Sequence, residues 1–414
     1  MNLELFIAKR ILNYKEIKDS ISGPITKIAV FSIALSITII ICTIFIVTGF
    51  KNEVSNKVTG FGGHIQISKL TSNISFETPP ISSNHDFYPN IDTIKGIHNI
   101  QVYASKPGIV KTSDIIQGIV IKGISSDFNW SFFKENLVEG NIFNIEDSVQ
   151  SNKVVISKSL SDLINLGVGD KFNVFFIQNP PRARRFEICG IYQTTLDEFD
   201  KLYVLADIKH IQALNGWSDD QISGFEIILD DFKDLDKISE KVKNIAGYRI
   251  LDDGSILNVS TVKEKNVQLF DWLGLFDLNV LVIIIIMLIV AGINMISGLL
   301  ILVLEKTQMI GILKSLGTNN RSIMRTFIYL ASFITVKGLF WGNIAGLLIC
   351  FIQYKFQVLK LDPSAYFLNA VPINFNLLYW ILINLGAFGA ILLALLNPAS
   401  IILKITPAET IRYE

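Results

Sequence analysis

The sequence is poor in cysteine. Cys42, Cys189 and Cys350 are spread over 414 residues, and the first and the last lie within long apolar runs. The region between those runs holds a single cysteine and therefore cannot form an internal disulfide. It must fold on its hydrophobic core alone, which its length allows.

Several signatures of chemistry are also missing. No G-x-x-x-x-G-K-[ST] motif occurs, so the chain has no phosphate-binding loop of the usual ATP-binding kind. No set of histidines and cysteines has zinc-ligand spacing, and the balance of 37 basic and 37 acidic residues gives no indication of nucleic-acid binding. No acid or histidine interrupts the long apolar runs, which argues against an intramembrane protease and a proton-driven carrier. We therefore expect a noncatalytic chain without metal or nucleic acid.

The chain is rich in apolar residues, which make up 50% of it and gather in four runs. The runs begin near residues 28, 279, 326 and 375, and each reaches the roughly 20 residues that a helix needs to cross a membrane. The expected fold class is an integral membrane α-helical protein with four transmembrane helices. A large α+β extracytoplasmic domain is expected between helices 1 and 2.

The distribution of lysine and arginine predicts the orientation. Five basic residues precede the first run and four lie between the second and third runs, so both segments are expected in the cytoplasm, together with both chain termini. The predicted segments are a cytoplasmic interfacial helix (1–27), transmembrane helix 1 (28–50), the periplasmic domain with stalk helices (51–278), helix 2 (279–304), a cytoplasmic coupling helix (305–325), helix 3 (326–353), a periplasmic loop (354–374), helix 4 (375–396) and a cytoplasmic tail (397–414).

Small and polar residues within the runs predict helix contacts. Ser32 and Ser36 in helix 1 allow close helix approach, or bond to their own backbone. In helix 2, polar groups at Asn294 and Ser297 are expected to bond across helices, with contact to a substrate as the alternative. Helix 3 carries a small-residue face, expected to pack on helix 4 or on a second protomer, formed by Gly338, Gly342 and Gly346. Counting along helix 3 from Ser322 places Lys337 past the membrane midplane, with its amine reaching the outer headgroups.

The loop between the second and third runs is predicted to be helical. Its apolar residues fall on one face at helical spacing, and they are Met309, Ile310, Ile312, Leu313 and Leu316. Gly317 can end this helix, and Thr318, Asn319 or Asn320 can cap the next. The apolar face can lie on the membrane surface or in a groove of a partner protein.

The domain between helices 1 and 2 alternates strand-like and helix-like segments. A hairpin is expected around Thr112-Ser113-Asp114, between strands at 101–111 and 115–124. A strand at 153–156, a helix at 157–165 and a strand at 171–177 follow. Further on, a strand at 223–229, a helix at 235–245 and a strand at 248–251 form a β-α-β unit, and helix resumes over 258–278.

A basic, proline-containing segment interrupts this domain at 178–185, QNPPRARR. Prolines cannot donate to a strand ladder, so Pro180 and Pro181 are expected at or beyond the tip of a hairpin. The three arginines are expected to crowd one exposed protrusion. That protrusion is either a solvated loop or a docking site for an acidic partner.

Five motifs resemble a known family. Residues 305–317, EKTQMIGILKSLG, resemble the coupling helix of ABC permeases of the MacB/FtsX/lipoprotein-releasing superfamily. Gly49-Phe50 with Glu53, the loop 361–367 (LDPSAYF) and the ending 406–414 (TPAETIRYE) resemble the lipoprotein-releasing permeases in particular. Residues 153–171, with L-G-x-x-x-G-D between helix and strand, resemble the periplasmic core domain of MacB-like permeases.

The resemblance implies a permease subunit of the bacterial inner membrane that extracts lipoproteins and hands them to a periplasmic carrier. ATP and Mg²⁺ would be bound by a partner ATPase, and two permease protomers, identical or homologous, would form an eight-span core. The implied ATPase contacts are Glu305, Lys306, Met309, Ile310, Gly311, Leu313, Lys314, Leu316 and Gly317. The implied carrier contacts are Pro180, Pro181, Arg182, Arg184 and Arg185. Within the superfamily, MacB-type efflux of peptides or small molecules and FtsX-like signalling to a cell-wall hydrolase remain open alternatives.

Overall fold

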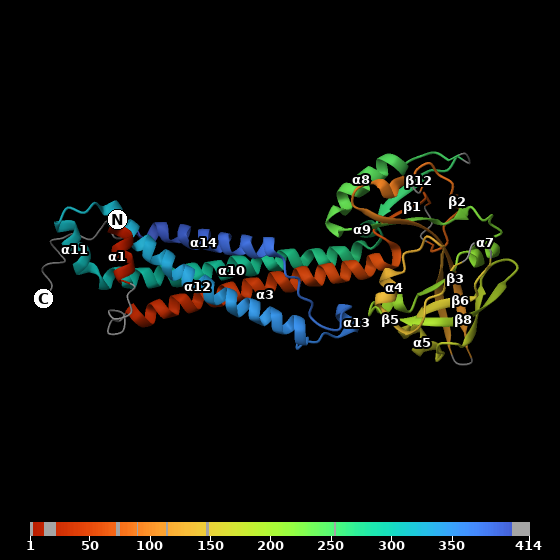
Figure 1. Ribbon diagram of the computed structural model, residues 1–414, viewed down its shortest axis with the longest axis horizontal. Helices are drawn as coiled ribbons and strands as arrows, with labels where there is room; N and C mark the ends of the chain where they lie inside the picture. The colour runs from red at the N-terminus through yellow and green to blue at the C-terminus, as the bar shows by residue number, and fades with distance from the viewer. Residues whose placement is uncertain are drawn as a thin grey trace. The chain divides into compact units, whose positions relative to one another are not determined.

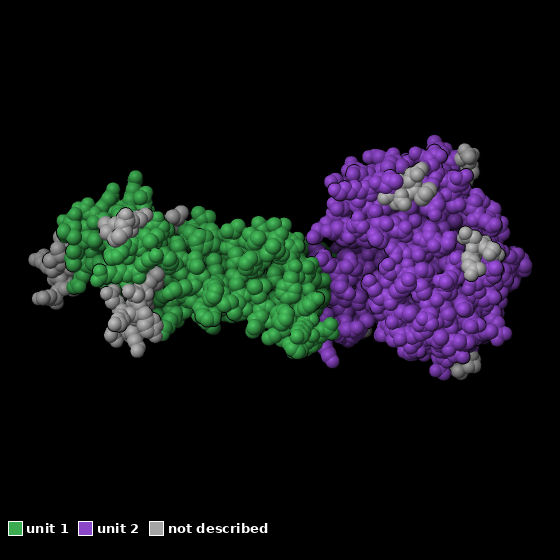
Figure 2. Space-filling view, in the orientation of Figure 1, with its two compact units in different colours: residues 1–50, 272–359, 371–414 green, residues 51–271, 360–370 purple. Residues whose placement is uncertain are grey.

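The computed structural model describes residues 3–11, 22–71, 75–88, 90–112, 115–145, 149–251 and 254–399. The chain divides into two compact units, shown in different colours in Figure 2. Unit 1 comprises Met1–Phe50, Trp272–Leu359 and Val371–Glu414, and unit 2 comprises Lys51–Asp271 and Lys360–Ala370. The predicted tail lies outside the described residues from position 400 onward.

Unit 1 is helical and contains the four candidate membrane spans. Its helices are α1 (Leu3–Ile11), α3 (Ser22–Gly62), α10 (Val267–Glu305), α11 (Thr307–Ser315), α12 (Asn320–Phe356) and α14 (Leu377–Ala399), where α3 and α10 also extend into unit 2. α3 has 41 residues and α10 has 39, so both are longer than the hydrocarbon core requires. Figure 1 shows α3 and α10 side by side, and Phe50 of α3 packs against Trp272 and Phe276 of α10.

The glycine face of α12 packs against α3. A Cβ at Gly338 would lie 2.6 Å from Cγ2 of Ile33, and one at Gly346 would lie 3.3 Å from Cβ of Ile41. The expectation that these glycines meet helix 4 or a second protomer is therefore wrong. The sequence shows that a close contact exists, but a small-residue face carries no information about which helix fills it.

α14 packs against α12 through a polar cluster that the sequence analysis missed. The amides of Asn343 and Asn384 exchange two hydrogen bonds of 2.6 and 3.0 Å, and the indole N–H of Trp380 donates to Asn343 Oδ1 at 2.6 Å. Two asparagines about 40 positions apart gave no periodic signal. Their pairing satisfies amide groups that would otherwise be costly to place in lipid.

The polar residues predicted to mediate helix contacts separate into two groups. Asn294 of α10 donates to the hydroxyl of Ser32 in α3 at 2.6 Å, and Ser36 is buried. Ser297, by contrast, is exposed on α10, and among the residues that the structure describes it makes no bond across helices.

Lys337 lies nearer the N-terminal end of α3 than was expected from the sequence. Its neighbour Gly338 packs on Val30 and Ile33, which follow closely after Lys27. Counting from Ser322 assumed that helix 3 enters the membrane there. Instead, the first turns of α12 pack against α1, and Ser322 donates to the carboxylate of Glu4 at 2.9 Å.

Unit 2 is an α+β domain built on a mixed sheet (Figure 1). The strand order is β12-β1-β11-β3-β4-β9-β6-β8-β5, and β7 pairs with β3 and β8. The strands are β1 (Ile65–Lys69), β3 (Ile97–Lys111), β4 (Ile116–Ile124), β5 (Leu137–Gly140), β6 (Lys153–Ser157), β7 (Lys171–Phe176), β8 (Arg182–Tyr192), β9 (Tyr203–Asp207), β11 (Gly224–Leu229) and β12 (Leu257–Thr261). A separate ladder joins β2 (Ile81–Ser82) to β10 (Gln221–Ile222).

Short helices complete unit 2. They are α4 (Ser131–Glu135), α5 (Lys158–Ile164), α6 (Asp197–Asp200), α7 (Lys209–Asn215), α8 (Leu235–Ala246), α9 (Val262–Lys265) and α13 (Pro363–Tyr366), with single 3₁₀ turns at Asn90–Thr93 and Phe232–Asp234. Ser157 caps α5 by accepting a hydrogen bond of 3.0 Å from the amide of Leu160.

The predicted hairpin between β3 and β4 is confirmed, with antiparallel pairing from Tyr103↔Ile124 to Lys111↔Ile116. The predicted strand at 248–251 is wrong, because only Ile250 forms an isolated bridge there. The strand after α8 is β12, where the sequence analysis expected helix. Leu257 and Val259 alternate with polar residues along β12, and the helix begins only after a capping box formed by Thr261 and Glu264.

His64 sits in the core where α3 leads into β1. Its side chain is buried, its Nδ1 accepts a hydrogen bond of 3.2 Å from the amide of Leu229, and its ring faces Phe232. Burial lowers the pKa of His64 to about 4, although the nearby charge of Asp231 acts in the opposite direction. The folded protein therefore holds this imidazole neutral.

Replacing Gly342 with leucine should overpack the contact between α12 and α3. A Cβ there would lie 2.7 Å from the carbonyl oxygen of Ala34, which is backbone and cannot move aside. We expect a loss of stability of about 1–3 kcal/mol or more, measured as a lower melting midpoint of the detergent-solubilised protein. Gly389 of α14 is the matched control, since no described atom lies within 4 Å of a Cβ there. Equal midpoints for the two leucine variants would contradict the tight contact.

Acidification should destabilise the protein through His64. An unfolded histidine titrates near pH 6.5, so as the pH falls the unfolded chain takes up this proton first. Stability is lost between about pH 6.5 and pH 4, and the loss should reach about 2 kcal/mol at pH 5. His64→Gln, which keeps a hydrogen-bond acceptor, should lack this component when unfolding is measured at pH 7 and pH 5. An identical pH dependence in the two proteins would refute the assignment.

Candidate functional site

α11 joins α10 to α12 and turns part of its apolar face inward. Ile310 is fully buried and Gly311 is buried, while Met309 and Leu313 pack against the buried cluster of unit 1. Part of the face that was predicted to bind a partner protein is therefore buried against helices of the same chain. A helix of this kind can bury its apolar side on helices of its own chain, and periodicity does not distinguish that from a partner's groove.

Two apolar side chains of α11 and its end remain accessible. Ile312 is 57% exposed and Leu316 is 77% exposed, and they lie one helical turn apart. Apolar side chains in adjacent, accessible positions are typical of a docking surface. Ile312 was not among the implied ATPase contacts, although it was placed on the apolar face.

The charged and glycine residues around α11 shape its two ends. Lys306 and Glu305 form an ion pair of 3.3 Å where α10 ends. Gly317 adopts φ +85°, a conformation that favours glycine, directly after α11. Asn319 caps α12 by accepting a hydrogen bond of 3.3 Å from the amide of Arg321. The predicted helix end is thus confirmed, and among the three predicted caps the structure selects Asn319.

The proline-containing segment forms the turn between β7 and β8. Both Pro180 and Pro181 precede β8, as predicted. The arginines do not crowd the tip, because they already belong to the ladder: Arg182 lies opposite Phe176, and Arg185 lies opposite Asn173. The alternation of a strand sends Arg182 and Arg184 to one side and Arg185 to the other.

Arg182 anchors the turn between β7 and β8 to α7 through a hydrogen bond. Its Nη1 donates to the carbonyl oxygen of Ala213 at 3.1 Å, and the side-chain amide of Gln178 donates to that of Leu214 at 3.2 Å. Carbonyls at the end of a helix are natural acceptors for a cation. The exposed turn is therefore held in place by α7, and Ile177 in it is 83% exposed.

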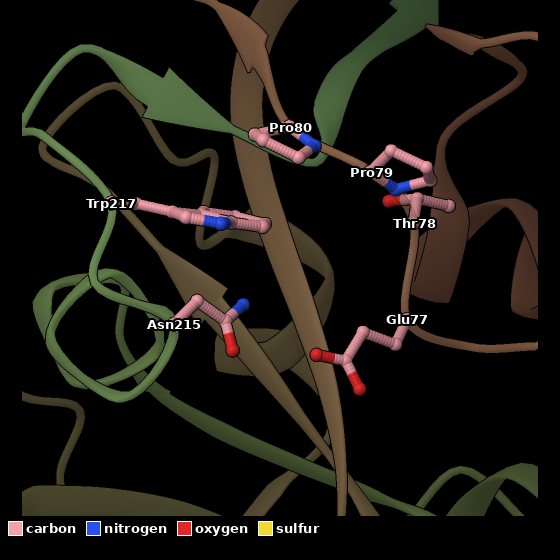
Figure 3. A pocket seen from close by; sticks show the side chains of 6 residues that line it. All are labelled: Glu77, Thr78, Pro79, Pro80, Asn215 and Trp217. Atoms are coloured by element: carbon pink, nitrogen blue, oxygen red, sulfur yellow. The ribbon is translucent and has the colours of Figure 1, made fainter. Parts of the chain in front are cut away.

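A small pocket of about 340 Å³ lies directly after α7. Figure 3 shows the ring of Trp217 facing Pro80 across it, with Glu77 and Asn215 on the side away from the prolines. Lys106 bridges the two polar residues, at 2.6 Å from Glu77 Oε1 and 2.5 Å from Asn215 Oδ1. The pocket thus combines apolar walls with an internally neutralised ion pair.

A further polar contact involves the loop that follows α12. The ammonium of Lys57 in α3 donates to Thr195 Oγ1 at 2.7 Å and to the carbonyl oxygen of Phe367 at 3.2 Å. Thr195 Oγ1 itself donates to Phe367 O at 2.7 Å. Burial lowers the pKa of Lys57, and the charges of Glu53 and Asp200 partly oppose this effect. We call this group the Phe367 contact.

Two residues of the Phe367 contact have strained backbones. Thr195 has φ +67° and Phe367 has φ +60°, values that side chains other than glycine rarely adopt. Asp200 holds Thr195 in place by accepting a hydrogen bond of 3.2 Å from its amide. Residues 361–367 stand out in the sequence only by their resemblance to a family motif, since backbone strain leaves no sequence signal at Thr or Phe.

Within the described part of the chain, no three histidine, cysteine, aspartate or glutamate side chains come together in a way that could hold a metal ion. None of the surfaces described above places a reactive group beside a base or an oxyanion site.

Two protein families match the chain. Residues 26–245 match the MacB-like periplasmic core domain family, which is more than half of the 414 residues, and residues 281–407 match the FtsX-like permease C-terminal family. The first match covers most of unit 2, and the second covers α11, α12 and α14.

Curated relatives align along the whole chain. The lipoprotein-releasing system transmembrane protein LolC of Buchnera aphidicola subsp. Schizaphis graminum is 26% identical over 403 residues, covering 94% of this chain and 93% of the relative. LolC of Xylella fastidiosa strain Temecula1 is 22% identical and covers 100% of this chain and 99% of its own. LolE of Haemophilus influenzae is 22% identical, covering 99% of both chains.

Proposed function

The chain belongs to the MacB/FtsX-like permeases, within the LolC/LolE type, and from this premise we propose that it is the membrane subunit of an ATP-driven ABC complex that extracts lipoproteins from the inner membrane. The subunit itself is noncatalytic. ATP and its Mg²⁺ ion bind to a separate ATPase subunit, and a second permease protomer, identical or homologous, completes the membrane core. The released lipoprotein passes to a periplasmic carrier.

The distribution of basic residues supports the proposed orientation. α1 and the segment around α11 carry lysine and arginine, which supports a cytoplasmic position for both and for the chain termini. Unit 2 then lies in the periplasm, inserted between the first and second spans. In this orientation α11 is on the same side of the membrane as ATP.

The observation that carries the proposal is the accessible pair Ile312 and Leu316 on α11. A helix that connects two membrane spans and buries one face on them is held firmly in the bundle. An ATPase subunit that binds these exposed side chains can therefore move the spans when the ATPase closes and opens. A peripheral subunit docks on such a helix through its apolar side chains.

The nature of the transported material can be tested directly. The complex should be purified in detergent, and the bound material identified by mass spectrometry. A triacylated lipoprotein supports the proposal. A cell-wall hydrolase in its place would indicate signalling, and a free peptide or small molecule would indicate efflux.

A charge on the accessible face of α11 should release the ATPase. Ile312→Asp and Leu316→Asp place a charge on an apolar contact, an effect of several kcal/mol, so we expect at least tenfold less co-purified ATPase. Because both side chains are exposed, the melting midpoint of the permease should not change. Ile177→Asp, at an exposed apolar residue of unit 2, is the matched control. ATPase recovered at wild-type yield with both variants would refute the docking surface.

The arginines of β8 should accelerate carrier association. Arg184 and Arg185 lack the anchoring bonds of Arg182 to α7, so changing both to serine removes charge while leaving the turn attached. We expect a several-fold lower association rate with the purified carrier in low salt. The difference should shrink at about 0.15 M, where the screening length is about 8 Å.

The matched control removes two exposed charges elsewhere in unit 2, with Lys237 and Lys241 of α8 changed to serine. Association is measured by surface plasmon resonance on the full-length permease at the two salt concentrations. Equal rates for the wild type and the arginine variant at both concentrations would mean that this segment is a solvated turn.

A further inference from the structure

One side of α12 is an accessible apolar stripe that begins at a charged residue. Trp341, Ile344 and Leu348 are 58%, 44% and 57% exposed, and their spacing of three and four residues places them on one side of the helix. Lys337, which is also exposed, lies one turn before Trp341 on the same side. Within the described chain this side of α12 is uncovered, so lipid or another protein must lie against it in a membrane.

The contact between α12 and α3 gives the depth of Lys337 in the span. A Cβ at Gly338 would lie 3.3 Å from the carbonyl oxygen of Val30. One at Gly346 would lie 3.3 Å from Cβ of Ile41, so the two helices run in the same direction. Val30 lies only about 3 Å along α3 from the start of its apolar run at residue 28. Lys337 is therefore near the edge of the hydrocarbon layer, at the end where α3 begins.

A second lysine lies at the same end of the two helices. Lys27 is exposed and lies one turn before Val30, on the side of α3 that meets α12. Side chains on a helix tilt toward its N-terminus, and α3 and α12 both run away from this end. The stems of Lys27 and Lys337 therefore direct both amines toward the headgroup layer.

Neither lysine is neutralised within the described chain. No ion pair or hydrogen bond joins the side chain of Lys27 or Lys337 to another described residue. The four apolar runs contain no aspartate or glutamate, so the spans of a second copy of this chain could not supply a counter-charge at this depth either. Charged side chains in spans normally have a partner. The anion that a bilayer itself offers at its headgroup layer is a lipid phosphate.

We propose that Lys27 and Lys337 bind the phosphate of an anionic phospholipid, with an acyl chain of this lipid lying along the apolar stripe of α12. Leu348 lies about 16 Å further along the helix than Lys337, which is close to the thickness of one leaflet's hydrocarbon, about 15 Å. The stripe thus begins at the charge and continues for the length of an acyl chain.

The two lysines favour a lipid with a net negative charge, such as phosphatidylglycerol, over phosphatidylcholine. Each lysine near an anionic lipid surface contributes about fivefold to the affinity. The choline of a zwitterionic headgroup has no carboxylate to meet beside Lys27 and Lys337 in the described chain. In the proposed orientation this lipid belongs to the cytoplasmic leaflet, and only that choice of leaflet rests on the proposed function.

The test is photocrosslinking of the full-length protein in nanodiscs that contain about one phosphatidylglycerol for every four phosphatidylcholines. Benzoylphenylalanine replaces Trp341 or, in the control, Leu393, which is 69% exposed on α14. Mass spectrometry identifies the lipids in the adducts. At position 341 we expect the ratio of phosphatidylglycerol to phosphatidylcholine to exceed that of the bilayer at least fivefold. At position 393 it should equal the bilayer ratio.

Charge variants test the role of the two lysines. Lys27→Gln combined with Lys337→Gln should reduce the ratio at position 341 to that of the bilayer. Both side chains are exposed, so the melting midpoint in detergent should not change. Changing both lysines to arginine keeps the charge and should preserve the enrichment. The matched control, Lys355→Gln with Lys360→Gln, removes two exposed charges beyond the other end of the stripe and should also preserve it.

Three results would overturn the inference. The first is a bilayer ratio at position 341, or an enrichment that the glutamine variant retains. The second is an adduct with a protein chain, which would make this side of α12 a protein interface. The third is loss of the enrichment in excess inorganic phosphate, which would assign the lysines to free phosphate. None of these results affects the identification of bound lipoprotein, so the proposed function is tested separately.

Discussion

The close approach of α12 to α3 is the contact on which unit 1 depends. Three glycines one turn apart remove the side chains that would separate the two backbones, so isoleucines of α3 fill the space instead. α3 also receives the hydrogen bond from Asn294 of α10. Further along, Val58 and Phe61 of the same helix enter the core of unit 2. One helix therefore contributes to both hydrophobic cores, and its position in the bundle is set mainly by the size of its neighbours' side chains.

The two units differ in the charge of the polar groups that they bury. Between α12 and α14 of unit 1 the bonded polar groups are uncharged, as in the Asn343–Asn384 amides. Removing a charge from water into hydrocarbon is expensive, and neutral amides give directional contacts at a smaller desolvation penalty. In unit 2 the chain buries a full ion pair, Lys122–Glu226, at 2.7 Å. That pair is satisfied by neighbouring side chains and by a backbone carbonyl, which is the condition under which a buried ion pair can be tolerated.

The sequence predicted the elements better than their contacts. The four spans, α11 and the β3–β4 hairpin follow from hydropathy and periodicity, which are local properties. The partner of Gly342, the inward face of Ile310 and the pairing of Asn343 depend on which helices meet, and no local pattern records this.

Strand pairing in unit 2 could not be predicted from the sequence for the same reason. The polar residues Gln66, Glu226 and Ser260 lie far apart in the sequence, and each looks like an ordinary exposed position of an alternating strand. Only the pairing of β1 with β11 and β12 brings them into one row. The position of the basic turn was predicted correctly. Its arginines, however, belong to β8 and pair with β7, so they do not gather at the tip of the turn.

The Phe367 contact gives the loop after α12 a role beyond connecting two spans. Residues 360–370 belong to unit 2, while the chain on either side of them belongs to unit 1. Strained conformations at both Thr195 and Phe367 persist only where surrounding contacts over-determine them, and here Lys57 and Asp200 supply those contacts. Because Lys57 belongs to α3, this hydrogen-bonded group joins a residue of the first long helix to the segment that connects α12 and α14.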